Sequence, residues 1–412
     1  MTERKIDWLS FGTCVALILA LCIPLVAFPG RGSAALEALY RFLMDELGVV
    51  YLLASLACIG LLTWLAFGRY GGVKLSSHGE GPEFSTVSWV AMLFCGGIGA
   101  GLMYWCGIEW TYYYTAPPFG AEPRSTAAAE WASTYGMYHW GITAWAIYCL
   151  PALAIAYPYY TRRIPWLRFS NGCHRYLQGR ELGPTARFVD FWLMVAIIAG
   201  AGSSLAFCTP MIAACIARVF GVPYEFWMNL LVIGLSVAIF ATSVWLGLKR
   251  GMKNLSDLTL LLSFVFLAYV LIVGPTNFLV RASVNSVGVM LQNYIRMNFW
   301  TDPYLRSGFL ENWTIFYWAW WMSYAPFIGL FVTRISRGRT IRAGVIGMLV
   351  FGSLGCALFY MVVGNFAMHL ELTGQLAVTE IVQNQGGPVA VVAVLDHLPW
   401  AWGAIAVFAL VS

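Results

Sequence analysis

Residues 96–105 read Gly96-Gly-Ile-Gly-Ala-Gly-Leu-Met-Tyr-Trp105 and lie within a long apolar run. Gly97, Gly99 and Gly101 are spaced two apart, which weakens a helix and lets a ligand approach the backbone. Where a half-helix restarts, its free N–H groups suit a carboxylate, and the carbonyls freed at the break suit a cation. Close packing of helices through small residues is the alternative. The stretch predicts either a broken helix at a binding site or a tight helix contact.

The composition places this stretch in a membrane protein. Of the 412 residues, 60% are hydrophobic and only 10% are charged. Soluble domains are roughly 45–50% apolar and about 25% charged, so a soluble enzyme and a disordered chain are excluded. The net charge of +5 is spread over short stretches between apolar runs, which argues against nucleic-acid binding. All cysteines except Cys173 lie inside apolar runs, which indicates neither disulfides nor a metal site.

A helix that crosses a bilayer needs roughly 20 mostly apolar residues, and the chain is predicted to contain about ten such spans. The first is too long for a signal peptide, so we expect it to be retained. The last is cut off at Ser412, so we expect the sequence to be part of a longer protein. The predicted fold class is therefore an all-α membrane protein. The predicted spans are 11–29, 49–67, 86–108, 137–158, 190–216, 227–247, 258–279, 312–333, 343–367 and 398–412.

The basic residues predict the orientation in the lipid bilayer. With the N-terminus inside, 17 of the 24 Lys and Arg residues fall in inner segments and 7 in outer segments, as the positive-inside rule requires. We therefore expect a multi-pass protein of the cell (inner) membrane with a cytoplasmic N-terminus. On the same rule, the basic segment from Arg334 to Arg342 is an inner anchor. The outer stretch 281–311 is long enough for a helix that lies along the membrane face.

A second informative stretch, 313–329, reads Trp-Thr-Ile-Phe-Tyr-Trp-Ala-Trp-Trp-Met-Ser-Tyr-Ala-Pro-Phe-Ile-Gly. Four of its aromatic residues share one helical face, and Pro326 with Gly329 then offers a break. Tryptophan gathers at the two membrane interfaces, but this stripe continues several turns into a span. A lipid-facing or packing stripe is the alternative. The aromatic face consists of Tyr317, Trp320, Trp321 and Tyr324.

The fourth predicted span adds Trp140 and Trp145, so that aromatic clusters on two spans accompany the Gly-rich break on a third. Together they predict one aromatic box. Such a box suits a quaternary ammonium group, which has no N–H to donate but is attracted to ring faces by ~0.5–2 kcal/mol each. Carboxylates would be the other solution, but these spans contain only Glu109 and the entry-side Asp190. As an intramembrane carboxylate Glu109 is a functional candidate, although we favour a structural salt bridge or hydrogen bond.

At these residues the sequence resembles the betaine/carnitine/choline transporter family. The resemblance implies twelve spans, an inverted five-plus-five repeat of the LeuT type in spans three to twelve, and a homotrimer. It also implies two peripheral N-terminal helices (1–85), a first repeat (86–280), an outer-face interfacial segment (281–311) and a second repeat cut off in its third helix (312–412). The matching stretches are 97–109, 138–141 with Trp145, and 316–326 continuing to 334–339.

Within the family, the chain looks most like the carnitine/γ-butyrobetaine exchangers. The segment 109–120 departs from the Glu-Pro that many sodium-coupled members carry there. The resemblance implies a zwitterionic quaternary ammonium substrate (carnitine, γ-butyrobetaine, betaine or choline), alternating access, no cofactor and no metal. The implied substrate-binding residues are Tyr112, Trp140, Trp145, Tyr317 and Trp321; Trp313, Trp320 and Tyr324 line the outer approach, and Gly97, Gly99 and Gly101 supply broken-helix backbone.

The fifth span bears on coupling. Sodium needs oxygen ligands, and sodium-coupled relatives place threonine hydroxyls before a glycine there. Here residues 196–202 read Ala-Ile-Ile-Ala-Gly-Ala-Gly, without a hydroxyl until Ser203, which favours sodium-independent exchange. The exchangers replace the ion by a basic side chain, for which Arg250 and Lys253 are candidates. Both also fit the positive-inside rule as simple anchors.

Other functions stay open. A sodium-coupled symporter of glycine betaine, choline or carnitine for osmoprotection is the alternative within the family. A membrane-embedded enzyme would need a nucleophile–base pair or a metal cluster facing a cavity, and the spans contain neither at recognisable spacing. A channel would need a carbonyl filter or a charged ring, and an aromatic box would obstruct its pore. We therefore expect a transporter and not an enzyme.

Overall fold

The computed structural model describes residues 8–76, 80–97, 99–164, 167–177, 180, 183–247, 251 and 253–412. Within this part of the chain the regular structure is helical, apart from one isolated bridge between Lys74 and Thr340. The all-α expectation is therefore confirmed. The candidate Arg250 lies outside the described residues.

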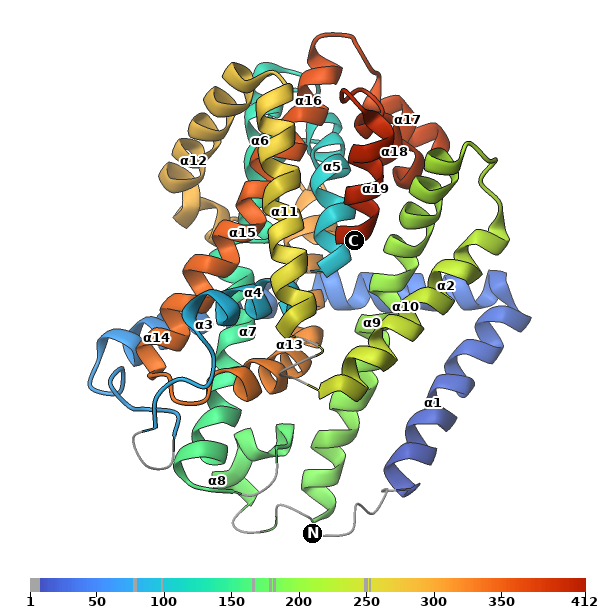
Figure 1. The fold of residues 1–412 in the computed structure, drawn as a ribbon. Helices are drawn as coiled ribbons and strands as arrows, with labels where there is room; N and C mark the ends of the chain where they lie inside the picture. Colours follow the sequence, from blue (N-terminus) through green and yellow to red (C-terminus); the bar gives the residue numbers. More distant parts are fainter. Residues whose placement is uncertain are drawn as a thin grey trace.

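The described helices differ widely in length. Figure 1 shows α1 and α3 on opposite sides of the molecule. The first group is α1 (Trp8–Ala27), α2 (Pro29–Arg41), the π-helical turn η1 (Phe42–Glu46) and α3 (Gly48–Phe67). The central group is α4 (Thr86–Gly97), α5 (Gly99–Thr115), η2 (Pro118–Gly120), α6 (Thr126–His139), α7 (Ile142–Ala156), η3 (Tyr157–Thr161), η4 (Phe169–Cys173), α8 (His174–Leu177), α9 (Pro184–Phe220), α10 (Phe226–Gly247), α11 (Lys253–Val273) and α12 (Thr276–Phe299).

The last group begins with the π-helical turn η6 (Leu310–Ile315), which leads directly into α13 (Phe316–Ile335). A long helix interrupted by two further π-helical turns follows: α14 (Ile341–Ile346), η7 (Gly347–Gly352), α15 (Ser353–Phe359), η8 (Tyr360–Gly364) and α16 (Asn365–Leu372). The chain ends with α17 (Val378–Gln385), α18 (Gly387–Leu395) and α19 (Ala401–Val411).

Seven helical stretches of the described chain are long and apolar enough to cross a membrane. Three shorter apolar helices lie at the other expected spans, 11–29, 86–108 and 398–412. Most of α12 falls within the stretch 281–311, for which a helix along the outer membrane face is expected. The seven stretches are Gly48–Phe67, Thr126–Thr161, Pro184–Phe220, Phe226–Ser243, Lys253–Val273, Leu310–Ile335 and Ile341–Leu372.

The glycine-rich stretch separates α4 from α5. Gly99 has a φ of +42°, in the left-handed region that side chains with a Cβ avoid, and a Cβ placed there would meet nothing within 4 Å. Figure 1 shows α4 and α5 running in different directions on either side of this point. The expected third span is therefore two shorter helices joined at the glycines.

The break expected at Pro326 and Gly329 is wrong, because α13 continues through both residues to Ile335. A proline removes one backbone donor, which a well-packed transmembrane helix tolerates. Gly329 serves close packing: a Cβ there would lie 3.1 Å from the backbone nitrogen of Ala152 in α7. The hydroxyl of Thr333 lies at the same contact, 2.8 Å from the Gly329 carbonyl and 3.0 Å from the Ala152 carbonyl, and can donate to either. The two helices thus meet backbone to backbone.

The expected fourth span changes direction where α6 ends at His139 and α7 begins at Ile142. Trp140 and Gly141 form this junction, and Gly141 has a non-helical φ of −95° and ψ of −144°. Its Cβ position would lie 2.4 Å from the Met137 carbonyl oxygen, so only glycine fits. The junction positions the Trp140 side chain between helices.

The substitution Gly329→Ala tests the contact between α7 and α13. Overpacking of this kind costs ~1–3 kcal/mol, so we expect a lower midpoint of thermal unfolding in detergent. Gly288→Ala in α12 is the matched control, because a Cβ at that position meets nothing within 4 Å. An unchanged midpoint for Gly329→Ala would contradict the close backbone approach.

Candidate functional site

Three of the predicted box residues form one buried cluster. The ring centroids of Trp140 and Trp321 are 4.8 Å apart at an interplanar angle of 71°, and those of Tyr317 and Trp321 are 5.4 Å apart at 28°. Trp140 and Tyr317 complete the triangle at 5.9 Å. All three side chains are at most 5% exposed. We call these three residues the aromatic cluster.

The residues expected on the outer approach continue from this cluster toward the surface. Trp320 stacks on Trp321 at 4.8 Å, and Trp313 lies 6.3 Å from Tyr317. Tyr112, expected in the central site, packs instead on Trp313 at 5.2 Å. These side chains are only partly buried, as is Tyr324. The aromatic surface therefore grades from buried to partly exposed.

Two other predicted residues lie away from the aromatic cluster. Trp145 packs edge-on to Tyr148 at 6.0 Å, and Tyr148 in turn contacts Trp321 at 5.8 Å. Tyr324 pairs with Phe327 and packs over Gly200 of α9, where a Cβ would clash with its ring. Trp145 is therefore one layer behind the rings of the cluster.

The broken helix runs beside the aromatic cluster. A Cβ at Gly101 would lie 3.6 Å from Cη2 of Trp140, an ordinary van der Waals contact. Gly99 has open space around its Cβ position. The start of α5 therefore packs on the indole of Trp140 through the buried Gly101, and Gly99, two residues before it, is exposed. Gly97 ends α4 on the other side of the break.

Glu109 is the polar centre beneath these rings. Its side chain is fully buried, and four groups donate hydrogen bonds to its two oxygens. Trp140 Nε1 and Tyr317 Oη donate to Oε2 at 3.0 Å and 2.8 Å, Tyr360 Oη donates to the same oxygen, and Tyr113 Oη donates to Oε1. Because all four groups donate to it, the carboxyl group of Glu109 acts only as an acceptor, as an ionised carboxylate does. Saturation by donors offsets the cost of burying it.

His139 extends this network. Because Tyr113 gives its single hydroxyl proton to Glu109, the contact of 2.9 Å between Tyr113 Oη and His139 Nδ1 requires the proton to be on Nδ1. In the neutral ring, Nε2 then accepts from the Thr314 hydroxyl at 3.0 Å. The carbonyl of His139 accepts from Trp321 Nε1 at 3.0 Å. Both indoles of the aromatic cluster are therefore held through their N–H groups.

Sequence reasoning missed Tyr113, Tyr360 and Thr314. Tyr113 could have been found, because it lies four residues after Glu109 on one helical face. Tyr360 and Thr314 lie in π-helical turns, η8 and η6, which recur at functional sites but have no simple sequence signal. For Glu109 itself, the hydrogen-bonded role that we favoured agrees with the geometry.

The basic candidate Lys253 lies where α11 packs on α4. Its Nζ is 2.6 Å from Asp257 Oδ2, and Ser88 of α4 donates its hydroxyl to the same oxygen at 3.3 Å. In the fifth span, the hydroxyl of Ser203 donates to the Gly200 carbonyl of its own helix at 2.9 Å. Among the described residues, no group of three or more His, Cys, Asp or Glu side chains is arranged to hold a metal ion.

Residues 10–412 match the family described as BCCT, betaine/carnitine/choline family transporter. The chain belongs to this family. It is 37% identical over 345 residues to an uncharacterized transporter, YeaV, of Escherichia coli K12. The aligned region covers 84% of this chain and 71% of that protein. It is 35% identical over 351 residues to a carnitine transporter of Acinetobacter baumannii, covering 85% of this chain and 63% of that protein. The BCCT chain is a multi-pass membrane transporter and not an enzyme.

Replacing Tyr360 by Phe removes one donor from Glu109 and little else. A hydrogen bond to a charged group contributes about 1.5–3 kcal/mol, so we expect a clearly lower midpoint of thermal unfolding for Tyr360→Phe. Tyr138→Phe is the matched control, because the Tyr138 hydroxyl is buried and has no partner among the described residues. Equal midpoints for the two variants would contradict the role given to Glu109.

Proposed function

We propose that this BCCT protein exchanges zwitterionic quaternary ammonium compounds, L-carnitine against γ-butyrobetaine, without sodium. One observation carries the proposal: the carboxyl group nearest to the aromatic cluster is already saturated by protein donors. Ring faces are then the remaining surface for a cation, and they attract a trimethylammonium group without needing an N–H from it. A transporter named for carnitine is among the relatives.

The rings of the aromatic cluster touch one another, with Trp140 and Trp321 only 4.8 Å apart. The substrate must therefore part these rings to bind between them. Its path would follow the graded aromatic surface from Trp313 and Trp320 inward. In alternating access, closing the rings around the ammonium group and reopening them on the other side would complete one transfer.

The carboxylate of the substrate would lie at the glycine break. Gly99 at the start of α5 is exposed, Gly101 packs on Trp140, and N–H groups at a helix start suit an anion. This arrangement separates the two charges of the substrate: rings hold the cation and backbone holds the anion. The aromatic and glycine sites thus favour a zwitterion over a simple cation.

Sodium independence is supported by the neighbourhood of Lys253. Its ammonium group and Asp257 occupy the contact between α11 and α4, and Asp257 is tied to α4 through Ser88. An ion pair made of the protein's own side chains can link α11 to the first half of the broken helix without a coupling ion. The fifth span offers Ser203, whose hydroxyl is engaged by its own helix.

The proposed topology places the N-terminus in the cytoplasm and the chain in the inner membrane. Loops expected on the inner side meet at one end of the molecule: Leu75 N donates to the Arg339 carbonyl, and Thr161 donates to the Lys74 carbonyl. Segments expected outside also meet, with the Arg296 guanidinium 4.1 Å over the Phe119 ring. The five-plus-five repeat within the boundaries given above, and a homotrimer, belong to the same proposal.

The variant Trp321→Ala tests the aromatic cluster. Loss of a ring worth ~2 kcal/mol or more in a desolvated site should weaken L-carnitine binding by at least ~10-fold. Trp402→Ala is the control, because Trp402 of α19 is 67% exposed and has no ring contact with the aromatic cluster in the described part of the chain. Binding is measured by isothermal titration of purified protein. Unchanged affinity in Trp321→Ala would overturn the assignment.

Uptake of labelled L-carnitine by proteoliposomes tests the exchange itself. The protein is reconstituted at full length, and vesicles are preloaded with γ-butyrobetaine or left empty, each with and without sodium. We expect uptake only into preloaded vesicles and indifference to sodium. Sodium-driven uptake into empty vesicles would instead establish the symporter, and no carnitine uptake at all would move the substrate to betaine or choline.

A further inference from the structure

Glu109 is hydrogen-bonded to the edges of two of the three rings of the aromatic cluster. Trp140 donates its indole N–H and Tyr317 its hydroxyl to the same carboxylate oxygen, Oε2, at 3.0 Å and 2.8 Å. The third ring, that of Trp321, donates its N–H to a neutral acceptor, the His139 carbonyl, at 3.0 Å. The carboxylate is therefore bonded to two of the rings whose faces are expected to hold the substrate cation.

The hydroxyl of Thr314 shows that Glu109 is ionised. Thr314 is 1% exposed, and His139 Nε2 at 3.0 Å is the one hydrogen-bond partner of its hydroxyl in the described chain. A buried hydroxyl proton needs an acceptor, so Nε2 accepts it and the neutral ring of His139 carries its own proton on Nδ1. Tyr113 Oη accepts from Nδ1–H at 2.9 Å and donates to Glu109. All four neighbours then donate to the carboxyl group, which leaves no acceptor for a proton on it.

The negative charge of Glu109 has no counter-charge in the described part of the chain. His139 Nδ1 lies 3.8 Å from Glu109 Oε1, but the imidazole is neutral. The ion pairs that lysine and arginine form in the same part of the chain are all with other carboxylates. A fully buried carboxylate is thus stabilised by hydrogen bonds alone, and a cation nearby would lower its energy further.

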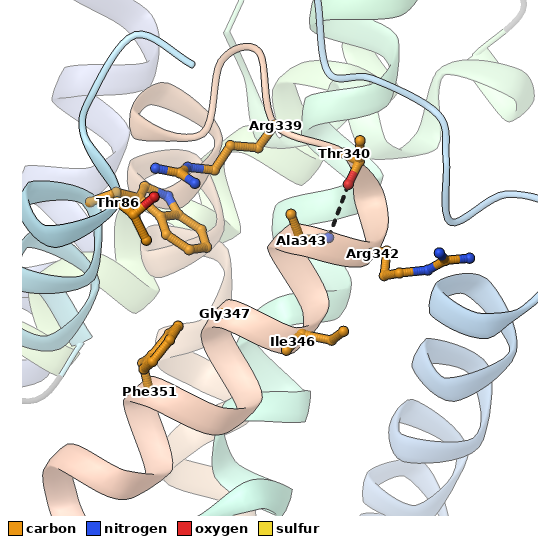
Figure 2. Close-up of a pocket in the computed structure, with 9 residues that line it drawn as sticks. Thr86, Arg339, Thr340, Arg342, Ala343, Ile346, Gly347 and Phe351 are labelled. Atoms are coloured by element: carbon orange, nitrogen blue, oxygen red, sulfur yellow. Dashed lines mark hydrogen bonds between the residues drawn. The ribbon is translucent and has the colours of Figure 1, made fainter. Parts of the chain in front are cut away.

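The arginines beside α14 are engaged elsewhere. Figure 2 shows Arg339 and Arg342 on opposite sides of the loop before this helix. The guanidinium of Arg339 lies 4.0 Å over the Trp89 ring, and Arg342 donates its Nε to the Ala66 carbonyl at 2.9 Å. Both side chains are therefore held by the segments around α14 and leave Glu109 without a cation.

A hydrogen-bond donor that is part of an aromatic ring transmits the charge of its acceptor to the ring face. Hydrogen-bonded groups polarise one another in a low-dielectric interior, so a bond to an anion leaves more electron density on the ring. The face of the ring is already the negative end of its quadrupole. A cation over Trp140 or Tyr317 is then attracted both by the ring and by the carboxylate at its edge. A neutral group of the same shape gains neither attraction.

We propose that Glu109 is a positioning residue that selects for the positive charge of the substrate through the rings of Trp140 and Tyr317, without contact with the substrate. This inference rests on the proposed function, because it takes the aromatic cluster as the site of the trimethylammonium group. The substrate then supplies the counter-charge that the described chain lacks. A carboxylate that only held the helices together would affect charged and neutral ligands equally.

The test compares γ-butyrobetaine with 5,5-dimethylhexanoate, in which a neutral tert-butyl group replaces the trimethylammonium group on the same chain. Both are titrated by isothermal calorimetry into the purified full-length protein, and the readout is the ratio of their dissociation constants. A purely structural role of Glu109 would change both constants by one factor and leave this ratio unchanged. We expect the unmodified protein to bind γ-butyrobetaine at least ~30-fold more tightly than the neutral compound.

Three variants locate the effect. Glu109→Gln removes the charge and keeps the shape of the side chain, so the ratio should fall by at least ~5-fold, and an unchanged ratio would overturn the proposal. Tyr317→Phe keeps the ring but removes its bond to Oε2, and should lower the ratio by about 3-fold. Tyr113→Phe is the matched control, because it removes a donor to Oε1 whose ring lies outside the aromatic cluster, and should leave the ratio unchanged. If Glu109→Gln does not fold, equal ratios in the two tyrosine variants would overturn the proposal.

The proposed function can fail separately from this inference. Absence of γ-butyrobetaine binding to the unmodified protein would contradict that substrate, and the comparison is then made with choline and its neutral isostere 3,3-dimethyl-1-butanol. A preference for choline that falls in Glu109→Gln would support the role given to Glu109. Absence of binding of both cations would overturn that role together with the aromatic site.

Discussion

The hydrogen bonds that converge on the buried carboxyl group of Glu109 hold together the helices that carry the aromatic cluster. The donors come from α5, from the junction of α6 and α7, from α13 and from the π-helical turn η8. An unpaired buried carboxylate is costly, so these four elements cannot drift apart independently. Any movement of one helix against the others must exchange donors at Glu109. This constraint couples the rings to the helices that would move during transport.

The same constraint shapes chemical selectivity. A carboxylate that is saturated by tyrosine and tryptophan donors is a poor partner for a substrate amine. The ring faces then determine which cation is bound. They attract a trimethylammonium group and give no special advantage to a cation with N–H donors. The glycine break beside Trp140 adds backbone for the opposite charge. Charge separation between rings and backbone is the physical basis of the proposed preference for zwitterions.

Much of this arrangement was predictable from the sequence. Apolar length predicted the helices, and the glycine spacing at 97–101 offered the break as one of two alternatives, because both are local properties. The continuation of α13 through Pro326 was not predictable. Gly329 packs against the backbone of α7 there, and this contact depends on the tertiary structure. Tyr360 joins Glu109 across 251 residues of sequence, and no local pattern reports such a pairing. Trp145 belonged to the right span but to the layer behind the cluster, which only packing decides.

The most direct test of this account is an electron cryo-microscopy structure of the full-length protein with L-carnitine bound. The account predicts the trimethylammonium group within about 6 Å of the ring centroids of Trp140, Tyr317 and Trp321. It also predicts Trp140 and Trp321 farther apart than 4.8 Å, with the tyrosine hydroxyls still on Glu109. A ligand whose ammonium group lies against the Glu109 carboxylate, with the tyrosines displaced, would contradict the account.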